Sequence, residues 1–357
     1  MTEKLNLPPF LVDHTPWESG PNPIWLATAF TLHRNLARYH FPSKLSPSDF
    51  KQILSILSEK LLASPTLKQP TCLKAEELNP HDKEFLYEHF LCTDGFQNSL
   101  GGQGFVVDTS GTFLGLINIE DHLLLKLIDS QGTWESAWNK LNQVETTLGE
   151  SIEFAFSPRF GYLTSEPNVC GTGLITQAYL HVPALVHTGQ LQEALVKQTD
   201  DNILTHGMEG TIDDLAGDLL IVSNSFTLGQ TEENILQSVQ LASMKIMALE
   251  KALRTRLKSE NNLDMKDHVS RSYGLLLHSY QLQTKETLAA LSLLKLGLDL
   301  GWIEGVTDGT LNTLFFKCRR AHLAEIVGAS LIDPHEAASK RSDFIRKQME
   351  KIHLKIN

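Results

Sequence analysis

The chain has 357 residues, of which 41% are apolar and 20% are charged, with a formal net charge of -11. This length and composition are typical of a globular protein with two domains, or with one large domain and an appendage. The negative charge excludes a protein whose whole surface attracts nucleic acid or an anionic membrane. An anionic ligand would therefore need a local basic pocket.

No targeting, membrane or metal signal stands out in the sequence. The first 23 residues lack the basic start and continuous apolar core of a signal peptide, and no run approaches the ~20 apolar residues of a membrane span. The four cysteines are scattered along the chain, and no His, Cys and Asp cluster has metal-ligand spacing: Cys72, Cys92, Cys170 and Cys318. We expect a cytoplasmic protein with free thiols and no structural metal.

The first third of the chain alternates between expected strands and helices. Residues 1–23 contain five prolines, which predicts an extended lead-in. A strand is expected at 24–30 (IWLATAF), and apolar residues at helical spacing predict a helix over 47–62. From Gly104, GFVVDTSGTFLGLINI is typical of a hairpin. The stretch EDHLLLKLI, residues 120–128, then shows helical periodicity.

The remainder divides into a strand-rich part and a helical part. Residues 152–158, 160–164 and 218–224 are expected to be strands. Thr231 is expected to cap a long helix, which carries one apolar stripe: Ile235, Val239, Ala242, Ile246, Leu249 and Leu253.

Beyond residue 256 the pattern is helical throughout. The chain is therefore predicted to be an extended lead-in over 1–23, an α+β domain over 24–256 and an all-α domain over 257–357.

One loop suggests chemistry. In FGYLTSEPNVCGTGL, residues 160–174, Gly171, Thr172 and Gly173 follow a predicted strand. Glycine adopts positive φ without steric cost, and successive amides in such a turn can bind an anion. The same residues also suit an ordinary tight turn, and both interpretations stay open.

Four ordered segments resemble the ATP:guanidino phosphotransferases, and most of all their bacterial protein-arginine kinase branch. They are WLATAFTLHRNLARYHFP, INIEDHLLLKL, FGYLTSEPNVCGTGLITQAYLHVPAL and HGMEGTIDDLAGDLLIVSNSFTLGQTEENI. The similarity covers roughly residues 24–257. It implies an antiparallel β-sheet flanked by helices, a helical C-terminal domain and ATP with Mg²⁺ as cofactor.

The resemblance also implies which positions bind nucleotide. By family position these are Ala27, Thr28, Ala29, Phe30, Thr31, His89, Leu124, Ile175, Thr176, Gln177, Ala178, Tyr179, His206, Gly207, Met208, Glu209, Gly210 and Thr211. The family surrounds the triphosphate with five arginines, whose planar forks suit phosphate oxygens. In this chain all five are replaced, by Ala29, Thr31, Leu124, Ile175 and His206.

Two carboxylates hold the guanidinium in this family. One is kept as Glu120, but its partner has become Thr211, and Glu166 replaces the substrate-loop cysteine. Charge-assisted hydrogen bonds contribute about 1.5–3 kcal/mol each, so losing five would slow the reaction by several powers of ten even if half of that applies. Glu120, Asp121, Glu166, Asp213 and Asp214 would also leave the site acidic. Phosphoryl transfer by the family's mechanism is therefore not expected.

Several residues keep two interpretations. Glu120 is either a guanidinium acceptor or a carboxylate held by nearby backbone. His89 is expected to be a packed core histidine rather than a contact to the nucleotide base. His206 is expected to be an ordinary surface or turn histidine rather than one that titrates near neutral pH and replaces a lost charge. Arg34 matches an arginine that the family keeps for structure.

The C-terminal region offers two further features. The basic stretch KRSDFIRKQMEKIHLK is expected to be a solvated helix face, with a partner-binding helix as the alternative. The family reads phosphoarginine with an Arg-Asp pair. An alignment anchored on Ile345 and Arg346 places Ala337 and Ala338 there, whereas a shift of a few residues would supply Arg341 or Asp343, so both registers stay open.

The leading hypothesis is a degenerate member of the family, a pseudokinase that acts by binding a protein in stress response or protein quality control, as a homodimer. The resemblance implies a small zinc-binding activator and a Clp-type unfoldase as partners. The alternatives are an active phosphotransferase on protein arginine with a rebuilt site, and a structural remnant.

Overall fold

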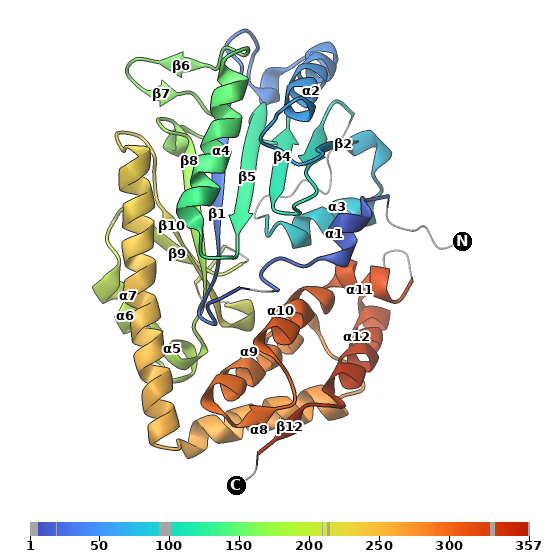
Figure 1. Ribbon diagram of the computed structural model, residues 1–357, viewed down its shortest axis with the longest axis vertical. Helices are drawn as coiled ribbons and strands as arrows, with labels where there is room; N and C mark the ends of the chain where they lie inside the picture. The colour runs from blue at the N-terminus through green and yellow to red at the C-terminus, as the bar shows by residue number, and fades with distance from the viewer. Residues whose placement is uncertain are drawn as a thin grey trace.

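The computed structural model describes residues 6–18, 20–92, 101–208, 210–212, 215–328 and 333–355. Eight strands form one antiparallel sheet in the order β2-β3-β4-β5-β1-β8-β10-β9, with helices on both faces (Figure 1). They are β1 (Trp25–Arg34), β2 (Thr71–Lys74), β3 (Gly104–Val107), β4 (Phe113–Ile117), β5 (Leu123–Asp129), β8 (Leu174–His181), β9 (Ile203–His206) and β10 (Leu219–Asn224). The predicted α+β class with an antiparallel sheet and a helical C-terminal region is confirmed.

Strand β1 lies at the centre of the sheet, between β5 and β8. Successive side chains of a strand point to opposite faces. Phe30 and Leu32 point to the face that α2 (Pro47–Leu62), α4 (Trp134–Gly149) and α7 (Glu232–Ser259) cover. We call this the α4/α7 face.

The opposite face of the sheet carries Ala27 and Ala29 of β1. It is covered by α1 (Pro9–Asp13), α3 (Pro80–His89), α10 (Asp308–Lys317) and α11 (Arg320–Ile326). We call it the α3 face.

Local sequence signals explain the helices that were predicted well. Helix α2 has the predicted bounds, and the Ser46 side chain caps it by accepting a hydrogen bond from the Asp49 amide. Thr231 caps α7 in the same way through the Asn234 amide, 3.2 Å away. Five members of the predicted stripe are buried, and Leu249 packs against the same core: Ile235, Val239, Ala242, Ile246 and Leu253.

The helix predicted for residues 120–128 is wrong, because this stretch forms the turn before β5 and most of β5 itself. Every residue of β5 is buried, so the strand has apolar side chains on both faces instead of an alternating pattern. A short run of this kind cannot be told from a buried helix by its periodicity. The strands predicted at 152–158 and 160–164 shrink to β6 (Phe156–Ser157) and β7 (Gly161–Tyr162).

The N-terminal segment is not merely extended. Pro9 starts the short helix α1, as proline suits the first helical position. Trp17 is 1% exposed, and the centroid of its ring lies 5.8 Å from that of Tyr179 in β8 and 5.0 Å from that of Phe316 in α10. The segment therefore closes the α3 face from the side.

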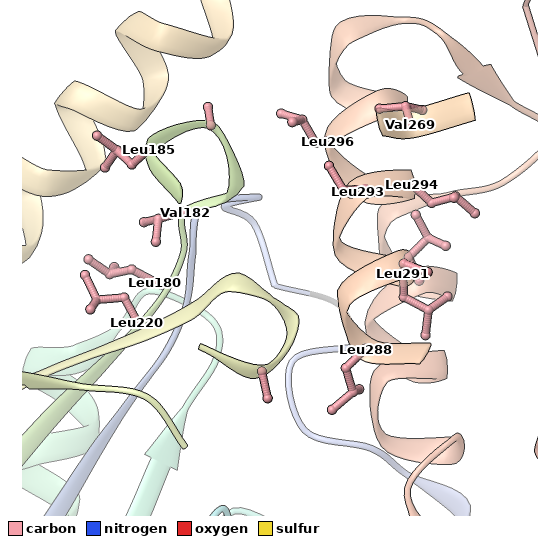
Figure 2. Packing of buried hydrophobic residues seen from close by; sticks show 14 of the residues in the cluster. Leu180, Val182, Leu185, Leu220, Val269, Leu288, Leu291, Leu293, Leu294 and Leu296 are labelled. Atoms are coloured by element: carbon pink, nitrogen blue, oxygen red, sulfur yellow. The ribbon is translucent and has the colours of Figure 1, made fainter. Parts of the chain in front are cut away.

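The C-terminal region consists of α8 (Leu263–His278), α9 (Thr284–Leu300), α10, α11 and α12 (Pro334–Met349), with a small strand pair, β11 (Ile303–Glu304) and β12 (His353–Leu354), that the sequence did not predict. Helix α9 lies against the end of the sheet, and Leu293 and Leu296 lie on its side toward Val182 and Leu185 (Figure 2). Among the described helices, none is both long and apolar enough to cross a membrane.

A buried ion pair joins α7 to this junction. The Arg254 Nε atom donates to Glu250 Oε1 at 2.8 Å, and Arg254 Nη2 donates to the carbonyl of His181 at 3.0 Å. The Glu250 carboxylate also accepts from the amides of Ala184 and Leu185, which begin α5 (Pro183–His187). One carboxylate thus holds a helix terminus and a buried guanidinium together.

We predict that Glu250→Ala lowers the free energy of unfolding by about 3–5 kcal/mol, because the buried Arg254 would lose its buried partner and keep only the more exposed Asp299 carboxylate at 3.4 Å. Urea denaturation measures this. The matched control is Asp267→Ala, which breaks the exposed pair between Asp267 and Arg271 at the same i,i+4 spacing and should change stability little. Equal effects of the two substitutions would contradict the prediction.

A second prediction concerns Lys295 of α9. Burial lowers the pKa of Lys295 to about 8 from 10.5, although Asp308 lies 3.3 Å away and Asn312 accepts a hydrogen bond from Nζ. At a pH between the folded-state pKa and the ordinary pKa, Lys295 is protonated in the unfolded chain and mostly neutral in the folded one. The free energy of unfolding therefore rises with pH in this range.

Relative to Lys295→Met, the wild type should gain up to about 1.4 kcal/mol per pH unit above pH 8. Denaturant titrations at several alkaline pH values test this, and parallel curves for the two proteins would argue against it.

Candidate functional site

The turn between β4 and β5 holds the family's carboxylate motif in a rigid frame. Asn118 has φ +59°, and its Nδ2 donates to the carbonyls of Phe50 and Gly102 at 2.9 and 2.8 Å. The Leu36 amide donates to His122 Nδ1, so His122 Nε2 carries the proton and donates to the His40 carbonyl at 2.9 Å. These bonds explain why Asn118 and His122 are kept where the arginines are not.

Asp121 is buried at the centre of this turn. Its carboxylate accepts hydrogen bonds from Asn35 Nδ2 (2.6 Å), the Ser165 amide (2.7 Å) and His33 Nδ1 (3.0 Å). Burial raises the pKa of Asp121, but the bonds from His33 and Ser165 outweigh it, and the pKa lies below its usual value. Asp121 therefore stays ionised as a structural acceptor. Its partner His33 was not singled out from the sequence, where no motif marks it.

Glu120 lies beside the substrate-loop segment of the family. Its carbonyl accepts a hydrogen bond from Ser165 Oγ at 2.9 Å, and its side chain is half-buried. Glu166, at the family's cysteine position, is exposed on the next residue. Glu120 and Glu166 therefore lie on two neighbouring segments, which the hydrogen bond from Ser165 to Glu120 joins.

The Gly171–Gly173 loop is tied into the protein by its own backbone. Gly171 has φ +115°, and a Cβ there would come within 2.7 Å of the Thr227 carbonyl oxygen. The Gly171 amide donates to the Tyr162 carbonyl at 3.1 Å, and the Gly173 carbonyl accepts from the His33 amide at 2.9 Å. These contacts are those of a structural turn packed against its neighbours.

Arg34 binds the backbone of the Gly171–Gly173 loop. It is 1% exposed, and its Nη1 donates to the Thr172 carbonyl at 2.9 Å while its Nε donates to Glu145 at 2.7 Å. Its guanidinium carbon also lies 3.5 Å from the ring centroid of Tyr162. This cation is therefore committed to the fold, as its structural assignment predicted.

Strand register places all five lost arginine positions on the α3 face. Thr31 pairs with Ile175 on one side and Lys126 on the other, and Leu124 pairs with His33. Ala29 lies in the next row, between Ile128 and Gln177. His206 lies in the row after that: it pairs with Ile221, which pairs with Tyr179, and Tyr179 pairs with Ala27. Residues far apart in the sequence thus share one surface of the sheet.

That surface is covered by packed side chains. Ala29 is 0% exposed, Thr31 8%, Leu124 6% and His206 8%, and only Ile175 of the five is partly exposed. Leu11, Trp17, Phe85 and Phe90 are among the apolar residues that pack there. His206 is therefore buried at the end of β9, next to the turn that follows, so the surface alternative of its expected surface or turn position is wrong.

Lys126 is a cationic side chain on this face. It is 5% exposed, and its Nζ donates to the carbonyl of Leu91 at 3.1 Å. The bond fixes the end of the segment that follows α3. Lys126 thus takes part in closing the face.

The other positions that bind nucleotide in the family are divided between the two faces of the sheet and the turn after β9. Gln177 and Tyr179 share the α3 face, whereas Thr28, Phe30, Thr176 and Ala178 point to the α4/α7 face. Gly207, Met208, Gly210 and Thr211 form the turn after β9, where the Gly207 amide donates to the Thr211 carbonyl at 2.7 Å. Glu209, Asp213 and Asp214 lie outside the described residues.

His89 is a core residue, as expected. It is 1% exposed and stacks on Phe85, with ring centroids 5.8 Å apart. Burial, with His322 nearby, lowers its pKa to about 3. It therefore stays neutral under physiological conditions.

These residues do not fit a magnesium triphosphate. Such a group needs several cationic donors around its oxygens. Among the described residues, the five arginine positions supply two aliphatic side chains, an alanine, a threonine and a buried histidine. We therefore derive no catalytic step through ATP at this face.

One of the two registers for the phosphoarginine pair falls on buried residues. Ala337 and Ala338 are 2% and 0% exposed. The nearby Arg341 is 2% exposed, and its guanidinium donates to the carbonyls of Cys318 and Leu282. Arg341 therefore stabilises the packing of α12.

Comparisons with known proteins agree with these motifs. Residues 52–253 match the family described as ATP:guanido phosphotransferase, C-terminal catalytic domain, and residues 262–356 match Protein-arginine kinase McsB C-terminal domain. A protein-arginine kinase of Chlamydia pneumoniae is 38% identical over 304 residues, covering 85% of this chain and 84% of its own. One from Halothermothrix orenii is 31% identical over 340 residues, covering 93% and 96%.

A solved structure of lombricine kinase has a TM-score of 0.57 at 17% identity and covers 71% of this chain and 73% of its own, which shows a shared fold. The sequence relatives and the matched families together show that this chain belongs to the protein-arginine kinase family of ATP:guanido phosphotransferases.

Proposed function

We propose that this chain is a family member that no longer transfers phosphoryl groups and acts by binding a protein. The observation that carries the proposal is the α3 face. All five positions that hold phosphate-binding arginines in the family lie on it, and none of them carries an arginine or lysine.

The packing of this face adds a physical reason. A charged triphosphate could enter only if buried apolar side chains moved and cations replaced them, since burying unpaired charge costs several kcal/mol. Two of the three cations closest in sequence to the replaced motifs, which are Arg34, Arg38 and Lys126, are already engaged: Arg34 with Glu145 and Lys126 with the Leu91 carbonyl. Either would have to break this bond to reach a phosphate.

The relatives' name, protein-arginine kinase, indicates that a protein is the natural partner class. We therefore propose a role in stress response or protein quality control in the cytoplasm, with a small zinc-binding activator or a Clp-type unfoldase as partner and a homodimer as the assembly.

The second candidate is an active phosphotransferase on protein arginine with a rebuilt site. Two observations favour it. Glu120 keeps its place at the rigid turn beside Ser165, and Lys126 lies next to Thr31 on the face where phosphate would bind.

A phosphorylation assay separates the two candidates. We expect no acid-labile phosphoryl group on arginine after incubation with Mg-ATP and an arginine-rich protein, measured by mass spectrometry. We also expect no thermal shift with ATP, since only a ligand that binds the folded state raises Tm. Modified arginine would establish the second candidate and end the first.

Protein binding is tested in parallel by co-purification with a small zinc-binding activator and with a Clp-type unfoldase. Binding of either supports the proposal. Failure of both, with a monomer in solution, would instead favour a structural remnant.

A substitution tests whether the α3 face is filled. We predict that Ala29→Arg lowers the free energy of unfolding by at least about 3 kcal/mol, because the new charge would be buried without a partner. Ala63→Arg serves as control, since Ala63 is exposed at the end of α2 and tolerates a cation there. A stable Ala29→Arg protein that gains an ATP-induced thermal shift would contradict the closed face.

A further inference from the structure

A separate cavity of about 200 Å³ lies on the α4/α7 face, where β1 begins and β5 ends. Its lining includes two indole side chains, one carboxylate and a side-chain amide: Trp25, Trp134, Asp129 and Gln240. Asp129 is the acidic residue among the lining side chains, and no basic residue lines the cavity. Its chemistry therefore suits a cation with an apolar body.

Asp129 has an unused acceptor. The side chain is 7% exposed, and Oδ1 accepts from the Gln131 amide at 3.0 Å and from Thr133 Oγ1 at 3.2 Å. Oδ2 is buried and has no hydrogen-bond partner, and no described residue forms an ion pair with Asp129. Its cross-strand neighbour Thr28 accepts a bond from Trp25 Nε1 instead.

A buried carboxylate oxygen without a partner is costly, and such atoms in native proteins call for an explanation. A cationic N–H donor in the cavity would pair with the Asp129 carboxylate at the cavity wall and neutralise its charge. The indoles of Trp25 and Trp134 would add attraction, because a cation is favoured over the face of an aromatic ring.

The walls favour one class of cation. A guanidinium is planar, stacks on aromatic rings and is less strongly hydrated than an ammonium ion, so it loses less on leaving water. We propose that this cavity binds an alkylguanidinium group, with its N–H groups directed at the Asp129 carboxylate and the planar group against the indoles.

This site is distinct from the family's guanidinium site. Glu120 precedes β5, whereas Asp129 ends it, so the two carboxylates lie at opposite ends of the strand. Thr28 falls within a nucleotide-binding range of the family, but it points to the α4/α7 face together with Asp129. The inference therefore does not depend on whether the proposed loss of phosphoryl transfer is correct.

The experiment uses the full chain with ¹⁵N-labelled tryptophan, whose five indole N–H signals can be followed individually. The probes are agmatine, as a free alkylguanidinium, and an N-acetylated, amidated arginine peptide. We expect saturable shifts of the Trp25 and Trp134 signals and little change in the other three.

Asp129→Asn keeps the Oδ1 acceptor but removes the charge, and should weaken binding at least about tenfold. Glu135→Gln, an exposed carboxylate beside Trp134 that does not line the cavity, is the matched control and should leave binding unchanged. Gln240→Arg offers a tethered guanidinium at the cavity wall and should abolish probe binding in a folded protein.

The two probes separate the sources of the ligand. Binding of agmatine but not of the peptide supports a small-molecule ligand, and binding of both supports an arginine side chain of a partner protein. No saturable shift with either probe would overturn the proposal. It would equally fail if Asp129→Asn bound as tightly as the wild type, or if binding depended on Glu120, tested with Glu120→Gln, rather than on Asp129.

Discussion

The register of β1 between β5 and β8 is the constraint on which the rest of the structure depends. Because side chains alternate along a strand, this register sends Ala29 and Thr31 to the α3 face and Thr28 to the α4/α7 face. A shift by one residue would exchange the two sets. The same pairing that gathers the lost arginine positions on one face therefore brings Thr28 and Asp129 together on the other.

Closure of the α3 face comes from both ends of the chain. The N-terminal segment contributes Trp17, and the C-terminal region contributes Phe316. Charged contacts reinforce this cover: the Arg320 guanidinium donates to both oxygens of Glu84 at 2.8 and 2.6 Å. With the buried Glu250–Arg254 pair at the other junction, these contacts make the helical region part of one packed body (Figure 1). The α3 face is thus part of the protein's core.

The polar side chains of the turn before β5 hold the surrounding buried groups in place. Asn118, Asp121 and His122 are retained because each satisfies buried backbone or side-chain groups around the turn before β5. Asp129 differs from these residues because its carboxylate lines a cavity that no described basic side chain borders. That difference is why the proposed guanidinium cavity stands apart from the ancestral site.

The sequence by itself determined the family and the elements with strong local signals, such as the Thr231 cap and the 47–62 helix. Only the tertiary structure decided that residues 123–129 form a strand, that Trp17 closes a face and that Asp129 borders a cavity with Trp25 and Trp134. The physical reason is the sequence distance over which each interaction acts. Caps and amphipathic stripes act within a few residues, whereas burial on both faces and an unpaired carboxylate depend on which distant segments pack together.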